Sequence, residues 1–167
     1  MTAFWPIQVW PTGAFVPAGT TRRQQILTAM ALQLQTILVS NGYTTDLGAH
    51  VYEWDTTPVD PGTELLRLEY RDAEESAGYI AVGEHYHKMP VEIRIICVQP
   101  TPLAVIRQMI ADVTVAIGLD FTFGGLAIDT NLDDVWTTDK GQAADVATGA
   151  SGKMVVEFLT EPWNPYQ

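Results

Sequence analysis

The sequence predicts an α+β fold in which a mainly antiparallel or mixed sheet is covered by two helices. A length of 167 residues is typical of one domain, and 47% hydrophobic residues are enough for a buried core. The predicted elements follow the order helix, four strands, helix, and two or three strands, which favours this class. We expect three parts: an extended proline and aromatic arm at residues 1–19, one α+β domain at 20–163, and a short C-terminal tail at 164–167.

The arm at residues 1–19 has its own composition. Trp5 and Trp10 each precede a proline, and Phe15 stands two residues before Pro17. Proline fixes its own φ and disfavours helix in the residue before it, so this segment is predicted to be extended. Its aromatic side chains need a surface to contact. That surface is either the arm's own domain or a neighbouring subunit.

The first helix is predicted over residues 20–41. Apolar residues recur there at helical spacing, Thr20 or Thr21 can cap the start, and Asn41-Gly42 can end it. Arg22 and Arg23 stand in the first turn, where the helix dipole disfavours cations. We expect these two arginines either to be solvated or to meet an acidic partner outside the chain.

Four strands are predicted next, near residues 49–54, 64–70, 79–87 and 91–98. In the last of these, every second residue from Val91 to Cys97 is apolar, and the other face becomes apolar toward its end. That pattern predicts a central strand beneath a helix. The intervening stretch 71–78, which contains Asp72, Glu74 and Glu75, is expected to be an exposed loop or the tip of a hairpin.

The second helix is predicted to start after Thr101 as N-cap, with Pro102 at its first position, and to end at Gly118. Like the first helix, it carries few charges. Strands are expected at residues 126–130, near 135–136 and at 154–160. A polar loop is expected over 131–152, with a mobile second half.

Residues with possible catalytic or metal-binding roles form no convincing pattern. His85 and His87 share one face of a predicted strand and could bind a metal with His50, which would suit a metal-dependent enzyme or a ligand-binding domain. A polar strand end explains the same pair. The acidic run at 129–133 lacks the glycine and glutamate of a calcium-binding loop, and Cys97 is expected to be buried and inert. We therefore expect no enzyme activity, no cofactor and no metal.

The charge composition limits the possible partners. The chain carries 9 basic and 20 acidic residues, and its formal charge of −11 disfavours conventional nucleic-acid binding. Only 17% of residues are charged, where about 25% is usual, which predicts a surface partly covered by other protein chains. The sequence also shows no bilayer-spanning stretch and no secretory leader, so a cytoplasmic place of synthesis is expected.

The layout over residues 22–163 resembles the tail terminator proteins of long-tailed bacteriophages, also described as minor tail protein U-like or tail completion proteins. The resemblance rests on the first helix with its stop, the second helix, and the last strand. Its residues are Arg22-Arg23-x-x-Ile26-Leu27, Leu34, Ile37-Leu38, Asn41 to Gly48, Pro102 to Val113, and Glu157-Phe158-Leu159-Thr160-Glu161-Pro162-Trp163.

This resemblance implies a structural virion protein. Its copies would form a hexameric ring that caps the tail-tube protein, ends tube polymerisation and meets a head–tail connector or neck protein. Genomic DNA would pass through the lumen without specific binding. Such a protein would be located in the tail or neck of the virion after assembly in the host bacterial cytoplasm. A different head–tail connector or neck protein is the alternative. The residues expected at the assembly interface are Trp5, Trp10, Phe15, Arg22, Arg23, Asp72, Glu74, Glu75 and Trp163.

Overall fold

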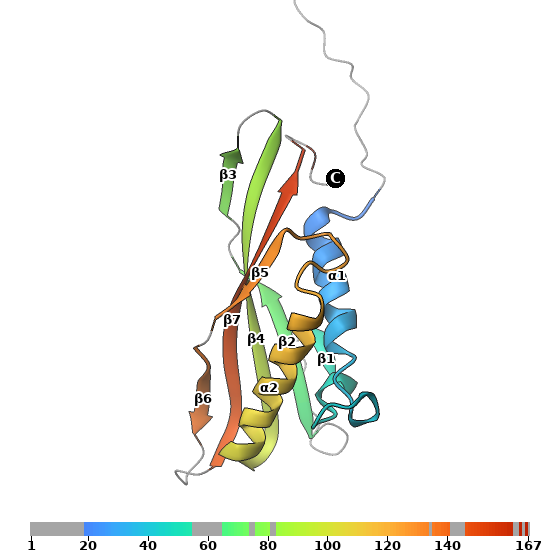
Figure 1. Cartoon of the computed structure of the whole chain (residues 1–167). Coiled ribbons are helices and arrows are strands. Elements are labelled where there is room, and N and C mark those ends of the chain that lie inside the picture. The colour runs from blue at the N-terminus through green and yellow to red at the C-terminus, as the bar shows by residue number, and fades with distance from the viewer. Residues whose placement is uncertain are drawn as a thin grey trace, which may run out of the picture.

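The computed structural model describes residues 19–54, 65–73, 76–80, 83–133, 135–140, 146–161, 164 and 166. Within these residues, two helices lie on one face of a mixed sheet of seven strands (Figure 1), which confirms the α+β class. The arm predicted at 1–19 lies outside the described residues except for Gly19. The tail is described only at Asn164 and Tyr166.

Two long antiparallel strands form the centre of the sheet. They are β4 (Glu84–Pro102) and β7 (Val146–Thr160), paired from His85 opposite Thr160 to Pro102 opposite Val146. Each long strand carries two short strands along its outer edge: β2 (Leu66–Asp72) and β3 (Ser76–Ile80) along β4, and β5 (Asp129–Leu132) and β6 (Thr137–Lys140) along β7. A further strand, β1 (Val51–Glu53), pairs with β2 in parallel.

The third and fourth predicted strands were placed incorrectly. The chain turns near Gly83, whose φ is +98°, and β4 then runs unbroken through residues 88–90, where a gap was predicted. The acidic stretch is not a hairpin tip, because β2 continues to Asp72 and β3 begins at Ser76. Pro90 is tolerated inside β4 because it faces the gap between β2 and β3. Its carbonyl accepts from Ala73 N at 2.8 Å on that edge, and its missing N–H would point the same way.

The long polar loop predicted at 131–152 is largely sheet. β6 occupies part of it, and β7 already begins at Val146; residues 141–145 lie outside the described part. The glycines that suggested mobility mark close packing instead. A Cβ on Gly149 would lie 2.3 Å from the carbonyl oxygen of Ile95, and one on Gly152 would lie 2.8 Å from the Trp136 ring.

The first helix, α1 (Arg22–Leu34), is shorter than predicted. Thr21 caps it as expected, accepting from Gln24 N at 3.2 Å. The chain then forms two short 3₁₀ turns, η1 (Val39–Asn41) and η2 (Leu47–Ala49). Gly48 packs against the end of α1, where a Cβ would lie 2.7 Å from the Leu34 and Gln35 carbonyl oxygens, so the helix stops before the chain crosses beneath it.

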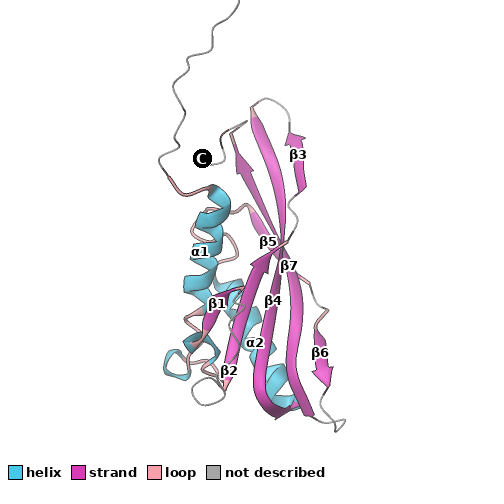
Figure 2. Cartoon of the chain, turned by 180° about the vertical axis from the view of Figure 1, so that it is seen from behind, coloured by secondary structure: helices cyan, strands magenta, loops and turns pink. Residues whose placement is uncertain are grey.

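The second helix, α2 (Leu103–Leu119), begins one residue later than expected. Pro102 is its N-cap, and Thr101 still belongs to β4, so the predicted threonine cap is wrong. Both helices cover the sheet face that contains Val91, Ile93 and Ile95, each at most 1% exposed, which confirms the prediction of a central strand. Figure 2 shows the molecule from behind, where the sheet lies in front and neither helix covers it. We call that side the open sheet face.

Candidate assembly interface

The outer side of α2 is almost free of charge. The side toward the sheet buries Ile106, Met109, Val113 and Ile117. The exposed residues of the helix are Ala104, Arg107, Gln108, Ala111, Thr114, Val115, Gly118 and Leu119. Arg107 is the one charged residue among them, and Val115 and Leu119 are 55% and 73% exposed. A surface helix normally carries polar and charged residues opposite its buried stripe, so this helix is suited to contact protein on both sides.

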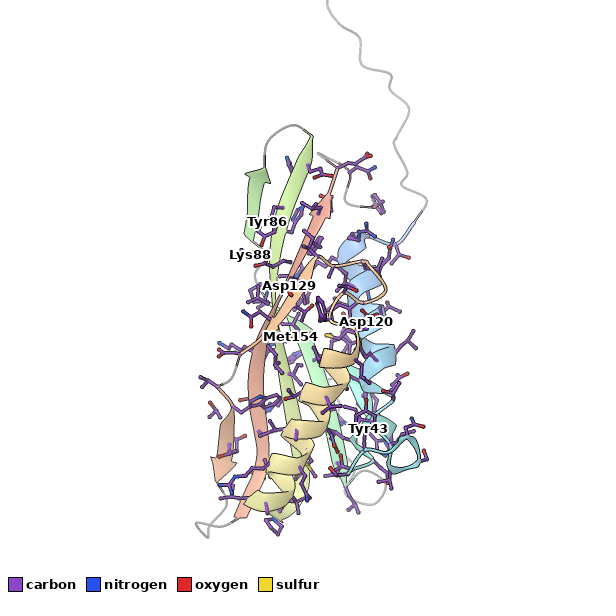
Figure 3. All side chains as sticks on the ribbon, in the orientation of Figure 1. Tyr43, Tyr86, Lys88, Asp120, Asp129 and Met154 are labelled. Carbon is purple, nitrogen blue, oxygen red and sulfur yellow. The ribbon has the colours of Figure 1, made fainter. Side chains whose placement is uncertain are left out.

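A groove lies beside this part of α2. It has a volume of about 270 Å³, and we call it the α2 groove; its lining residues are Asn41, Gly42, Tyr43, Asp112, Val115 and Leu119. Figure 3 labels Tyr43 and also Asp120, which follows the groove residue Leu119 at the end of α2. The Tyr43 hydroxyl is buried and has no hydrogen-bond partner among the described residues. The α2 groove thus sets two exposed apolar side chains, Val115 and Leu119, beside the polar residues Asn41 and Asp112.

More exposed apolar side chains flank the same end of α2. Phe121 follows the C-cap residue Asp120 and is 48% exposed, and Val39 in η1, two residues before the groove residue Asn41 in the sequence, is 54% exposed. Val115 and Leu119 share one groove, and adjoining exposed apolar side chains are typical of contact surfaces, whereas single scattered ones are ordinary. We regard α2's outer side and its groove as the strongest candidate interface in the described part of the chain.

Asp112 holds the wall of the groove in place. Its side chain is buried, and it accepts from Thr44 N, from the Thr44 hydroxyl at 2.8 Å and from the Thr45 hydroxyl at 2.8 Å. The carboxylate therefore ties the loop after η1 to α2. Asp112 was not among the residues predicted from the sequence. The signal it offered was an acidic residue at a position on the buried stripe of an otherwise apolar helix.

The open sheet face has a different character, because basic and acidic residues occur there in nearly equal numbers. The strands β2, β4, β5, β6 and β7 place five basic and six acidic residues there: Arg67, Arg71, Lys88, Arg94, Lys153, Glu69, Glu84, Glu92, Glu157, Asp129 and Asp139. Arg71 bonds to Glu92 at 2.7 Å and lies 3.8 Å from the centre of the Trp54 ring. Buried Arg67 and Glu69 approach to 3.5 Å. The excess negative charge of the chain must therefore lie outside these strands' open face.

One cluster on this face joins Tyr86, Lys88 and Glu157; Tyr86 and Lys88 are labelled in Figure 3. Lys88 Nζ donates to Glu157 Oε1 at 2.8 Å. Hydrogen bonds from Lys88 and then Tyr86 hold the pKa of Glu157 below its usual value, and the bond to Glu157 raises the pKa of Lys88. Because the cluster is exposed, its ion pair contributes little to stability. The pair adds no net charge to the face.

The nine residues predicted for the interface are only partly placed. Trp5, Trp10, Phe15, Glu74, Glu75 and Trp163 lie outside the described residues. Arg23 forms an ion pair through Nε with Asp72 of the same chain, and its Nη2 donates to the Ala73 carbonyl at 3.2 Å. One expectation for Arg23 was an acidic partner outside the chain. Its acidic partner is instead Asp72 of the same chain, at the end of β2. Arg22 is partly buried, and its Nε has no hydrogen-bond partner in the described structure.

The three histidines do not come together. His85 and His87 are neighbours, with ring centres 6.3 Å apart, but His87 stacks on Phe158 and bonds to the Thr160 hydroxyl at 2.8 Å. His50 lies elsewhere: its carbonyl accepts from Leu68 N, and Leu68 lies opposite Ile95 of β4. Ile95 is eight residues from His87, which is roughly 26 Å along the strand. Among the described residues, no group of three or more His, Cys, Asp or Glu side chains could hold a metal ion.

The single cysteine is also part of the core. Cys97 is 5% exposed, as predicted, and burial raises the pKa of its thiol, so little reactive thiolate forms near neutral pH.

Comparison with known proteins adds no assignment: no protein-family model matches the sequence, and no curated protein matches it. Neither described helix is long and apolar enough to cross a lipid bilayer.

Proposed function

We propose that this chain is a structural subunit of a bacteriophage tail, which forms a ring that ends polymerisation of the tail tube and joins the tail to the head or neck. The proposal takes its family from the resemblance of the sequence and its support from one structural observation. That observation is the charge-poor outer side of α2, with exposed Val115 and Leu119 above the α2 groove.

Leaving the apolar side chains of this side in water costs free energy. Full burial of a valine or leucine side chain is worth about 1.5–3 kcal/mol, so covering the exposed parts of Val115, Leu119 and Phe121 would contribute about 1 kcal/mol each. Contacts of this kind suit a subunit that repeats the same interface many times. A head-to-tail contact between copies closes into a ring when its rotation closes, and a closed ring leaves no free end within its plane.

The proposed partners are other copies of the chain and the proteins above and below the ring. Further copies of the chain would cover the α2 side, and the ring would meet the tail-tube protein on one face and a connector or neck protein on the other. Genomic DNA would pass through the ring without specific binding. The chain has a charge of −11, and its described open sheet face carries no excess of basic residues. It therefore offers a duplex few of the cationic contacts that hold phosphates.

The test of this proposal measures the mass of the purified chain by light scattering over a range of concentrations, with tail-tube protein added. We expect a ring-sized species. A double variant with Val115→Lys and Leu119→Lys should lose it, because burying two ammonium groups is costly. The control is Thr137→Lys, which adds a cation at an exposed position of β6 and should assemble normally.

Two results would contradict the proposal. The chain could stay monomeric at all concentrations with and without tube protein, or the double variant could assemble as well as the control. A third result would favour the alternative. If antibodies against the chain label the neck of the virion and not the end of the tail tube, the chain is a different connector or neck protein.

A further inference from the structure

We propose that α2 of one copy docks, by its outer side, in a hollow on the open sheet face of the next copy. The inference rests on the proposed ring and adds the surface that receives α2. Three observations carry it: the hollow itself, an order of charges along the hollow that matches the order along α2, and the placement of the two surfaces on opposite sides of the molecule.

The hollow lies where β5 pairs with β7. Its volume is about 360 Å³, and we call it the β5 hollow; its walls include Pro90, Asn131, Asp133, Lys153 and Val155. Pro90 and Asn131 both lie opposite Val155 in the sheet register, on the face away from the helices. Apolar surface in the middle of polar groups is typical of a contact between proteins.

Charged and apolar residues follow one order along this hollow. Lys153 is exposed, and no described residue forms a hydrogen bond or an ion pair with it. The carboxylate of nearby Asp133 instead accepts from Val135 N at 3.2 Å. Two residues after Lys153 comes Val155, and Asp129 lies opposite the position two residues further, about 13 Å from Lys153 along β7. The order is therefore cation, apolar residues, anion.

The outer side of α2 presents the opposite order. Four exposed residues, each four positions after the last, form one ridge along the helix: Arg107, Ala111, Val115 and Leu119. The cation stands near the start of the helix. Its end carries the negative pole of the helix dipole and the carboxylate of the C-cap Asp120. Hydrogen bonds, first of all from the Thr122 hydroxyl, hold the pKa of Asp120 below its usual value.

The two orders match when Asp120 lies above Lys153 of the next copy. Val115 is then about 8 Å along the helix axis from Asp120, and Val155 is about 7 Å along β7 from Lys153, so the two valines meet. Arg107 is about 20 Å from Asp120 along the same axis, and its long side chain reaches back to Asp129. Opposite charges at both ends fix the register of the contact.

The positions of the two surfaces exclude a contact within one chain. Both helices lie on one side of the sheet in Figure 1, and Figure 2 shows the open sheet face on the other side. The buried stripe of α2, which includes Met109 and Val113, holds the helix on its own sheet. The occupant of the β5 hollow must therefore be α2 of another copy. Each copy gives one helix and receives one, which is a head-to-tail contact that can close into a ring.

The first test uses disulfide trapping in the full-length protein. One variant carries Val115→Cys on α2 together with Asn131→Cys, an exposed position in the β5 hollow. The matched control keeps Val115→Cys and replaces the second change by Leu32→Cys, an exposed position of α1. The native Cys97 is buried in both.

After oxidation with copper–phenanthroline, we expect the first variant to form a series of disulfide-linked oligomers that ends at the subunit number of the ring. The linked product should exceed that of the control by at least about tenfold, because docking raises the local thiol concentration. Yields equal to the control would overturn the inference. Dimers from a chain carrying Val115→Cys alone, in the same yield, would overturn it too, because α2 would then pack against α2.

The second test exchanges the charges at one end of the contact. Arg107→Glu and Asp129→Arg each place like charges together, so each should raise the apparent dissociation constant in light scattering about fivefold. A chain that carries both changes restores the pair and should associate like the wild type. Thr137→Lys lies outside the β5 hollow and is the control. Single variants that associate normally, or a double variant that is no better than they are, would contradict the proposed order of charges.

The outcomes separate this inference from the proposed function. If the wild type forms a ring that the Val115→Lys and Leu119→Lys variant lacks, but the linked oligomers do not exceed the control, another surface receives α2; the inference fails and the ring remains. If the linked oligomers form and the chain is absent from phage tails, the contact stands and the proposed function fails.

Discussion

The loop that lines the α2 groove depends on one buried carboxylate, which makes Asp112→Asn a sharp test of the structure. Asp112 is 6% exposed, and its Oδ2 atom alone accepts from Thr44 N at 3.1 Å, the Thr44 hydroxyl at 2.8 Å and the Thr45 hydroxyl at 2.8 Å. Asparagine has the same shape but no charge. Its amide nitrogen donates hydrogen bonds and cannot accept them. Whichever way the amide is turned, the nitrogen therefore faces at least one group that also donates.

The size of the effect follows from the strength of these bonds. Hydrogen bonds to a charged group contribute about 1.5–3 kcal/mol each, and neutral ones about half as much. Weakening three bonds, with some relaxation of the loop, should lower the free energy of unfolding by about 2 kcal/mol for Asp112→Asn. Asp112→Ala leaves three donors without an acceptor and should lower it by about 3 kcal/mol.

Urea unfolding followed by circular dichroism measures this change. The control is Asp129→Asn, the same substitution at an exposed position of β5, which should stay within about 0.5 kcal/mol of the wild type. If Asp112→Asn is no more destabilising than Asp129→Asn, the carboxylate does not hold the loop, and the account of the groove wall is wrong.

Three further predictions concern other parts of the fold. Arg23→Glu should cost about 1 kcal/mol because it opposes Asp72, and adding Asp72→Arg should restore most of the loss in urea unfolding; equal stability of the single and double variants would refute the pairing. Gly149→Ala should cost about 3 kcal/mol, since its Cβ would meet the backbone of β4, whereas Gly118→Ala, in open space on a helix, should be neutral or stabilising by up to about 1 kcal/mol. Burial raises the pKa of Tyr70 from 10.0 to about 12, so the unfolded chain loses this proton at lower pH than the folded chain. The free energy of unfolding should therefore fall between pH 10 and pH 12. Tyr70→Phe should show a smaller fall in urea titrations over that range.

The sequence predicted the parts of the fold that depend on local pattern. Periodic apolar residues identified both helices and the buried face of β4. It failed where pairing across the sheet overrides local preference. Pro90 lies inside β4 because the neighbouring edge has a gap, and Gly149 and Gly152 lie inside β7 because their partners approach closely. Neither fact can be read from residues that are adjacent in sequence.

The sequence predicted that the candidate interface would be poor in charge, but not where on the fold it would lie. The low charge of the second helix is visible in the sequence and indicates covered surface. The groove beside Tyr43 and the pairing of Arg23 with Asp72 are not visible, because both join residues that are distant along the chain. The ion pair also changes the meaning of the first-turn arginines: one of them anchors α1 to the end of β2.

The most direct test of the account is the location of this protein in a phage particle that encodes it. Antibodies raised against the purified chain and labelled with gold can be imaged on intact virions by electron microscopy. The account predicts label at the junction between the head and the tail tube, with unjoined or overlong tails when the chain is absent. Particles that lack the protein altogether, and whose tails assemble and join normally without it, would contradict the claim that its outer surfaces serve assembly.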